Sequence, residues 1–308
     1  MVESQIVEDA IKTLELCTEG CFEIRPLPVE KGAFFFENVE EARGYIETIL
    51  SPPKKNFYFT INPVNRDSLE RVDGFLQKKI GQCTCAGDII KRRWLPFDID
   101  AGQKKDTAAS VEEKQNAFEL GTLIKECLSA LGWADPIEAD SGNGYYLLYR
   151  IDLDTPSKSV EHVLNSLHNK FVGICGTAHI DTNIHDANRI IRLFGTRNLK
   201  ANRISKLISI PHKIECTSIK LLRMFESTAI ESITPKKQIV IDGKIPKGNR
   251  DTGGLKVARA MAFRGRPKQE IIEELLNITK PPLPPKDCER LANRAIEYET
   301  KKIGRAHV

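Results

Sequence analysis

The sequence predicts a mixed α/β or α+β domain built around one sheet, followed by a small all-α domain. Apolar segments of strand type alternate with amphipathic segments of helix type up to about residue 215. A polar, glycine-rich segment, IPKGNRDTGG, then precedes three helix-type segments that are separated by Gly and Pro. We expect a first domain over residues 1–240, a linker over 241–254 and a helical domain over 255–302.

Each expected element follows from its local pattern. Strands are expected where short apolar runs are bounded by Gly, Pro or polar residues, over 21–27, 32–36, 56–64, 95–102, 136–140, 144–153 and near 179–181. Helices are expected where apolar residues recur every three or four positions, over 7–16, 38–50, 110–131 and 157–171. The longest of these helices begins with a capping box formed by Ser110 and Glu113. Three more helices are expected within 255–265, 267–279 and 284–302.

The bulk composition describes a globular protein without a membrane anchor. Of the 308 residues, 41% are hydrophobic and 29% are charged. No apolar run approaches the roughly 18 residues of a membrane span. The N-terminal segment MVESQIVEDAIKTLEL is acidic and amphipathic, unlike a signal peptide. We therefore expect a cytoplasmic protein with no membrane partner.

The basic residues are clustered, although the net charge is only +4. The segment RIIRLFGTRNLKANRISK (189–206) carries six basic residues and no acidic one, and a second basic stretch over 244–268 has acid only at Asp251. Clusters of this kind favour a polyanionic partner. The alternative is a solvated basic face without a partner.

The eight cysteines are expected to be reduced, because the chain has no export signal. Cys17 with Cys21, and Cys83 with Cys85, have the spacings C-x3-C and C-x-C. Structural zinc sites favour two to four intervening residues in both halves. We therefore expect no zinc.

The segment LPFDIDAG (95–102) raises the main functional question. Side chains alternate along a strand, so Asp98 and Asp100 project to one face, where their charges repel. A divalent cation is the simplest partner, because hard cations bind carboxylate oxygens. The alternative is an exposed pair that ends the strand before Gly102.

Two further segments carry chemistry. In SGNG (141–144), Gly142 and Gly144 permit a tight turn and close approach of a ligand, and Ser141 with the backbone N–H groups can bind phosphate oxygens. An ordinary hairpin turn is the alternative. The other segment is HIDTNIHDANRIIRLFGTRNLK, where Asp181 precedes the basic run. A histidine-containing metal site, formed by His179, Asp181 and His185, is a further alternative there.

In this order, these three segments resemble the archaeo-eukaryotic primase superfamily, particularly the primase-polymerases of phages and plasmids. The family carries a D-x-D motif, a Gly-rich turn and a third acidic residue. CFEIR and NFYFTINPVN are similar to the strands before the acidic motif, and DANRIIRLFGTRNLK is similar to the family's Asn, Arg, Gly-Thr and Lys stretch. The helical C-terminal part resembles the small primase C-terminal domain. The similarity extends over most of residues 15–300.

The resemblance implies a catalytic core on an antiparallel sheet like that of an RNA-recognition motif, joined to an N-terminal α/β subdomain. It implies ligands for two Mg²⁺ or Mn²⁺ ions, namely Asp98, Asp100 and Asp181. It also implies residues around a bound NTP or dNTP, namely Ser141, Gly142, Gly144, Tyr146, Arg189 and Arg192. The basic residues expected along template or primer phosphates are Arg197, Lys200, Arg203 and Lys206.

Tyr146 departs from the family pattern, which has histidine in the strand after the turn. A tyrosine offers a neutral hydroxyl, whereas a histidine can offer a charged donor. Three accounts remain open: Tyr146 substitutes adequately with charge from Arg192 or Lys200, the enzyme binds nucleotides weakly and relies on Mn²⁺, or the site is degenerate. Phe194, where the family commonly has proline, is a smaller departure that affects loop shape.

The expected function is that of a DNA primase/polymerase of a mobile-element replication system, acting on a single-stranded DNA template and primer. The alternatives are a catalytically degenerate replication initiator of the same fold and a repair- or defence-associated primase-polymerase. A helicase, fused or separate, is a possible partner. The final letters, KIGRAHV, back-translate to the start of a short-read sequencing adapter, so residues 303–308 are expected to be a non-native tail on a longer natural chain.

Overall fold

This computed structural model describes residues 2–28, 33–49, 55–67, 83–102, 106–155 and 158–226 of the N-terminal part. Further along the chain it describes 245–246, 257–258, 261–262, 266–280 and 284–305. The chain divides into two compact units. One comprises Met1–Gly173 with Thr177–Glu231, and the other comprises Ile174–Gly176 with Ser232–Val308. Each unit is described by itself.

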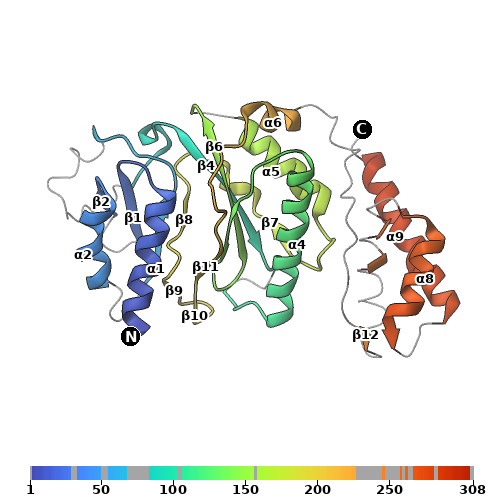
Figure 1. Cartoon of the computed structure of the whole chain (residues 1–308). Coiled ribbons are helices and arrows are strands. Elements are labelled where there is room, and N and C mark those ends of the chain that lie inside the picture. The colour runs from blue at the N-terminus through green and yellow to red at the C-terminus, as the bar shows by residue number, and fades with distance from the viewer. Residues whose placement is uncertain are drawn as a thin grey trace. The chain divides into compact units, whose positions relative to one another are not determined.

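The first unit contains a four-stranded sheet near its N-terminus, in the order β2-β1-β3-β8 and antiparallel throughout. Its strands are β1 (Phe22–Leu27), β2 (Phe34–Phe36), β3 (Asn56–Thr60) and β8 (Ile190–Arg192). Helices α1 (Val2–Cys17) and α2 (Val39–Ile49) lie beside this sheet (Figure 1). Apolar side chains of both helices and of the strands share one buried cluster with the second sheet.

The second sheet has five strands in the order β11-β5-β6-β4-β7. Its strands are β4 (Arg92–Asp100), β5 (Ile137–Asp140), β6 (Tyr145–Leu153), β7 (His179–Ile180) and β11 (Lys206–Ser209). Helix α4 (Val111–Ala130) lies between β4 and β5, and α5 (Lys158–Phe171) lies between β6 and β7. The order of elements is therefore βαββαβ with an antiparallel sheet, which is the topology of an RNA-recognition motif, extended by β11 at one edge.

The fold class is thus confirmed as α+β with an antiparallel core. The expectation of one sheet, drawn from the alternation of elements alone, is wrong, because the N-terminal strands pair with β8 and form a sheet of their own. Strand periodicity does not reveal which strands pair, so this partition could not be read from local patterns. The α/β subdomain that the family resemblance implies corresponds to the first sheet and its two helices.

The two faces of the second sheet are buried differently. Leu95, Phe97 and Ile99 of β4 are fully buried on the face covered by α4 and α5, which lie on the side away from the first sheet (Figure 1). Trp94 and Tyr146 belong to the apolar cluster shared with α1 and the first sheet. The opposite face of β4 therefore points toward the first sheet. Helix α4 begins as predicted, because the Ser110 hydroxyl and the Glu113 side chain cap each other's backbone N–H.

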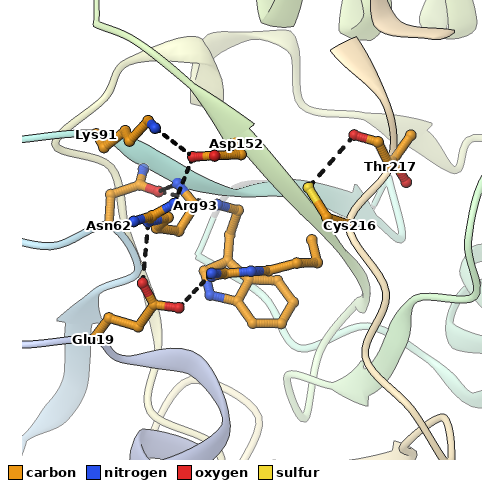
Figure 2. Close-up of polar contacts among 9 residues, drawn as sticks. Glu19, Asn62, Lys91, Arg93, Asp152, Cys216 and Thr217 are labelled. Carbon is orange, nitrogen blue, oxygen red and sulfur yellow. Dashed lines mark hydrogen bonds and ion pairs between the residues drawn. The ribbon is translucent and has the colours of Figure 1, made fainter. Parts of the chain in front are cut away.

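An ionic network joins the end of α1 to two strands of the second sheet (Figure 2). Glu19 accepts a hydrogen bond from Arg150 of β6 and forms an ion pair with Arg93 of β4, with 3.0 Å between the Glu19 carboxylate and Arg93 Nε. Asp152 pairs with Arg93 at 2.5 Å and with Lys91 at 2.9 Å. Glu19, which follows the last residue of α1, therefore links the helix that packs on the first sheet to β4 and β6 of the second sheet.

Several short elements complete the first unit: η1 (Ala86–Asp88), η2 (Thr182–His185), β9 (Arg197–Asn198), β10 (Arg203–Ile204), α6 (Ile219–Arg223) and η3 (Met224–Glu226). Strands β9 and β10 form a two-stranded hairpin. The basic run 189–206 is thus built into β8, the β9–β10 hairpin and the start of β11.

The second unit contains helices α8 (Lys268–Ile278) and α9 (Pro285–Arg305), and the short parallel strands β12 (Ile245–Pro246) and β13 (Thr279–Lys280). Its own buried cluster includes Ile271, Leu275 and Leu291. Most of the expected linker and of the helix within 255–265 lie outside the described residues. Helix α9 continues through Arg305, and 306–308 lie outside the described residues.

No helix of the described residues is long and apolar enough to span a membrane. The described cysteines are all free thiols. Burial raises the pKa of the Cys17 thiol to about 12, which disfavours the thiolate that zinc requires. Cys85 donates its thiol hydrogen to Asp88 at 3.0 Å.

Candidate active site

Asp98 and Asp100 lie at the C-terminal end of β4, on the face that points toward the first sheet. Asp98 is opposite Tyr146 in the β4–β6 ladder, and Asp100 is opposite His179 in the β4–β7 ladder. Both aspartates are half-buried. Alternation along the strand therefore places both carboxylates on one face, as predicted, and neither is a fully exposed strand end.

Asp98 is in an environment that disfavours its charge. The Tyr146 hydroxyl donates a hydrogen bond to its carboxylate. Burial, followed by the negative charge of Asp100, raises the pKa of Asp98 to about 7, although the bond from Tyr146 opposes the rise. Burial also raises the pKa of Asp100, and the positive charge that His179 can carry opposes that rise.

Asp181 is brought to the same place by β7. Its backbone N–H donates to the Asp98 carbonyl at 2.8 Å, and its charge raises the pKa of both Asp98 and Asp100. The carboxylate accepts from the Asn183 backbone N–H at 2.9 Å and from Arg189 at 3.3 Å. The three predicted carboxylates thus come together from two distant segments, and Arg189 lies with them.

The three carboxylates suit a hard divalent cation, since Asp100 and Asp181 raise the pKa of Asp98, Asp181 also raises that of Asp100, and a cation would relieve that repulsion. They are not preassembled as a metal site. Among the residues that the structure describes, no group of three or more His, Cys, Asp or Glu side chains is arranged to hold a metal ion. Tyr146 bonds to Asp98 and Arg189 bonds to Asp181, so each of these two carboxylates already has a side-chain partner.

A buried cation lies near Tyr146, the residue that contacts Asp98. Arg192 of β8 is 4% exposed, and it donates to the Tyr58 hydroxyl at 2.8 Å and to Asn56 Oδ1 at 3.3 Å. Its guanidinium lies 4.8 Å from the centre of the Tyr58 ring. Burial and the Asp98 charge raise the pKa of Tyr146, whereas the Arg192 charge opposes the rise. Arg192 therefore faces the site, and no carboxylate of the described residues pairs with it.

Lys200 supplies a second cation near the carboxylates. It is exposed, at the tip of the β9–β10 hairpin, and its charge lowers the pKa of Asp100 against the larger effect of burial. Its backbone N–H is held by Asn198 Oδ1 at 3.1 Å. The hairpin therefore presents Lys200 toward the carboxylate side of the sheet.

The SGNG segment forms the hairpin turn between β5 and β6. The Ser141 hydroxyl accepts from the N–H of Gly144 at 2.8 Å and of Asn143 at 3.2 Å. Gly142 has a φ of +83°, which favours glycine. A Cβ on Gly144 would lie 2.6 Å from the Ile99 carbonyl oxygen, so the turn packs directly on β4 beside the carboxylates. The hydroxyl of Ser141 is thus engaged as an acceptor within the turn.

The remaining predicted basic residues are dispersed. Arg197 donates to Asn202 Oδ1 at 3.0 Å within its own hairpin. Arg203 donates to the Ala109 carbonyl at 2.9 Å and to the Gly142 carbonyl at 3.3 Å. Lys206 is exposed on the edge strand β11.

The sequence analysis missed Asn56 and Tyr58, which hold Arg192. A signal was present, because both lie at alternate positions of NFYFT and therefore share one face of β3. The role of Phe194 also emerges only from the fold. Its ring meets the Tyr146 ring edge-on at 5.6 Å between centres, and it supports the tyrosine that contacts Asp98.

No family model matches the chain, and no curated protein matches it. Similar solved structures include the AEP domain of the cyanophage S-2L primase-polymerase, at 11% identity and a TM-score of 0.41, over 68% of this chain and 92% of that chain. The catalytic domain of primase RepB′ in complex with initiator DNA is similar at 11% identity and a TM-score of 0.45, over 72% and 94%. Primase RepB′ itself is similar at 11% identity and a TM-score of 0.44, over 98% and 99%.

Proposed function

We propose that this protein is a metal-dependent nucleotidyltransferase of the archaeo-eukaryotic primase superfamily, a DNA primase/polymerase of a phage- or plasmid-like replication system. The observation that carries the proposal is the convergence of Asp98, Asp100 and Asp181 opposite Arg192, which has no carboxylate partner among the described residues. Acidic ligands beside a buried cation suit a reaction that handles phosphates and divalent ions.

In the proposed reaction, a primer 3′-oxygen forms a bond to the α-phosphorus of an NTP or dNTP. The bond from that phosphorus to the β-phosphate oxygen breaks, pyrophosphate leaves, and the hydroxyl proton passes to solvent. Two Mg²⁺ or Mn²⁺ ions would activate the 3′-hydroxyl and neutralise the leaving pyrophosphate. Asp98, Asp100 and Asp181 would hold these ions, and Arg192 with Lys200 would bind phosphate oxygens.

Tyr146 has a different role in this proposal from the family histidine. Its hydroxyl has one hydrogen to donate, and the hydrogen is directed to Asp98. Tyr146 therefore orients a carboxylate, and the charge for binding phosphate comes from arginine and lysine. Arg189 bonds to Asp181, and it would be available to a triphosphate if Asp181 bound a metal ion instead.

The test is incorporation of labelled nucleotides on a primed single-stranded DNA template, with Mg²⁺ and then with Mn²⁺. We expect extension that depends on the template and is abolished by Asp100→Asn. Asp154→Asn is the matched control, because it makes the same chemical change at an exposed aspartate outside the site, in the second D-x-D sequence of the chain. Equal extension by the two variants would contradict the proposed metal ligands.

The second candidate is a replication initiator of the same fold without catalysis. Two observations favour it: the Tyr146 bond to Asp98, and the absence of a preassembled metal cluster among the described residues. It predicts binding of single-stranded DNA with no incorporation in either metal. A primase-polymerase in repair or defence would instead incorporate nucleotides, and the genes beside its own would separate that role from replication.

A further inference from the structure

A groove of about 350 Å³ lies on the other side of the SGNG turn from the carboxylates. Helix α4 forms one wall, through Val111, Lys114 and Phe118. The other wall is formed by Ile208 of β11, at the edge of the second sheet, and by Arg203 of β10, in the β9–β10 hairpin. The groove is partly open to solvent, so a ligand can reach it from the surface.

We propose that this groove binds a single-stranded segment of nucleic acid, with a base stacked on Phe118 and backbone phosphates beside Arg203 and Lys206. The inference rests on the proposed function, since the strand would be the one that the active site copies or extends. Three features of the groove support it: exposed apolar side chains, uncompensated positive charge and continuity with the active site.

Exposed apolar side chains are concentrated in this groove. Of the seven large hydrophobic residues that are exposed in the described part of the chain, three line it: Val111 at 83%, Phe118 at 42% and Ile208 at 45%. The Phe118 ring is held perpendicular to the Tyr145 ring, with 5.2 Å between their centres. An exposed aromatic ring in a fixed orientation is the usual platform for an unpaired base.

The uncompensated charge of the groove is positive. Its acid, Asp140, is neutralised by Lys114 at 2.6 Å. The Arg203 guanidinium is held by two backbone carbonyls, and no carboxylate of the described residues pairs with it. Lys206 is exposed and lies opposite Asp140 in the β11–β5 ladder, next to the groove. Cations along a groove with an aromatic platform favour a polyanion that carries bases over a protein partner.

The groove and the active site share the SGNG turn. Gly144 lines the groove, and the same residue packs on the Ile99 carbonyl, one residue before Asp100. Arg203 also donates a hydrogen bond to the Gly142 carbonyl of the turn. A nucleic-acid strand that extends from the carboxylates therefore has a short path around the turn into the groove.

The first measurement is the affinity of the full chain for a fluorescein-labelled oligothymidylate, by anisotropy. We expect Phe118→Ala to raise the Kd about tenfold, as for loss of one stacked base. Ile219→Ala is the matched control, because Ile219 is 43% exposed on α6, away from the groove.

The salt dependence of the affinity tests the phosphate contact. Lys206→Ala should lower the slope of log affinity against log salt by about one. Lys213→Ala, which makes the same charge change at an exposed lysine paired with Glu215, should leave the slope unchanged.

A second variant gives a readout that does not depend on the stability of Phe118→Ala. Phe118→Trp should bind the oligonucleotide, and its fluorescence should be quenched on binding. The two native tryptophans, Trp94 and Trp133, are 2% and 4% exposed and contribute a constant background. Ile219→Trp should show no quenching.

The outcomes separate this inference from the proposed function. A loss of affinity in Phe118→Ala with quenching in Phe118→Trp supports the groove, even if no nucleotide is incorporated and the polymerase proposal fails. Unchanged affinity and no quenching overturn the groove, even if the wild-type protein extends primers. Failure of the wild-type protein to bind the oligonucleotide also overturns it, as expected of a groove that serves a protein partner.

Discussion

Asp98 is a residue at which the proposed active site opposes folding. Its pKa of about 7 lies above the ordinary value of 3.8, so the folded protein binds a proton there more tightly than the unfolded chain does. The free energy of unfolding therefore falls as the pH rises from about 4 to about 7, unless a cation enters.

We predict that Asp98→Asn is more stable than the wild-type protein at pH 8 in the presence of a chelator, by about 2 kcal/mol after allowance for solvent screening of the half-buried carboxylate. The difference should shrink as the pH falls toward 5, because the wild-type carboxyl becomes neutral. Thermal unfolding across this pH range measures it. Asp154→Asn should show no such trend, and a wild-type protein more stable than Asp98→Asn at pH 8 would contradict the assigned environment.

We predict that Tyr146→Phe keeps its packing on Phe194 but raises the pKa of Asp98 further, because the lost hydrogen bond favours the charged carboxylate. Metal binding requires that carboxylate to be deprotonated. The rise in melting temperature caused by Mn²⁺ should therefore appear at a higher pH than in the wild-type protein. A midpoint that moves to lower pH would show that Tyr146 does not stabilise the ionised form.

The SGNG turn is the element whose backbone is most constrained by the site. A Cβ on Gly144 would meet a backbone oxygen of β4 at 2.6 Å, whereas a Cβ on Gly44 in α2 would meet nothing within 4 Å. We predict that Gly144→Ala destabilises the protein by about 1–3 kcal/mol through steric strain. Gly44→Ala should stabilise it by about 0.5–1 kcal/mol, as expected in a helix interior. Chemical denaturation of both variants tests the pair, and similar effects would contradict the packing of the turn.

Elements that depend on local sequence were predictable. Apolar spacing and the Ser110 capping box identified α4, and alternation identified the common face of Asp98 and Asp100. Pro96 did not prevent the β4 strand, since it lies where only β6 is a neighbour among the described strands. The common face of Asn56 and Tyr58 could be read from the alternation in β3, but their contact with Arg192 could not, because it depends on which strand lies beside β8. The positive charge of residues 189–206 was evident from the sequence, but the separate positions of its basic side chains in the fold were not.

At the scale of the whole first unit, the active site lies between two sheets whose relative placement must be fixed. The network around Glu19 is one such constraint, at the N-terminal end of β4 (Figure 2). We predict that Glu19→Gln lowers the free energy of unfolding by about 1 kcal/mol, because both ion pairs are partly exposed. The loss should shrink in concentrated salt, where the charges are screened. Urea unfolding at two salt concentrations measures it, and a salt-independent loss would point to packing instead.

The position of Asp181 depends on the register in which β7 pairs with β4. Only two residue pairs, Ile99 with Ile180 and Asp100 with His179, align it with β4. A single-codon insertion that shifted β7 by one position would turn Asp181 away from its partners, whereas a shift of two would preserve its side of the sheet. The register of β7, and with it the parity of the length of the segment before it, therefore keeps Asp181 beside Asp98 and Asp100.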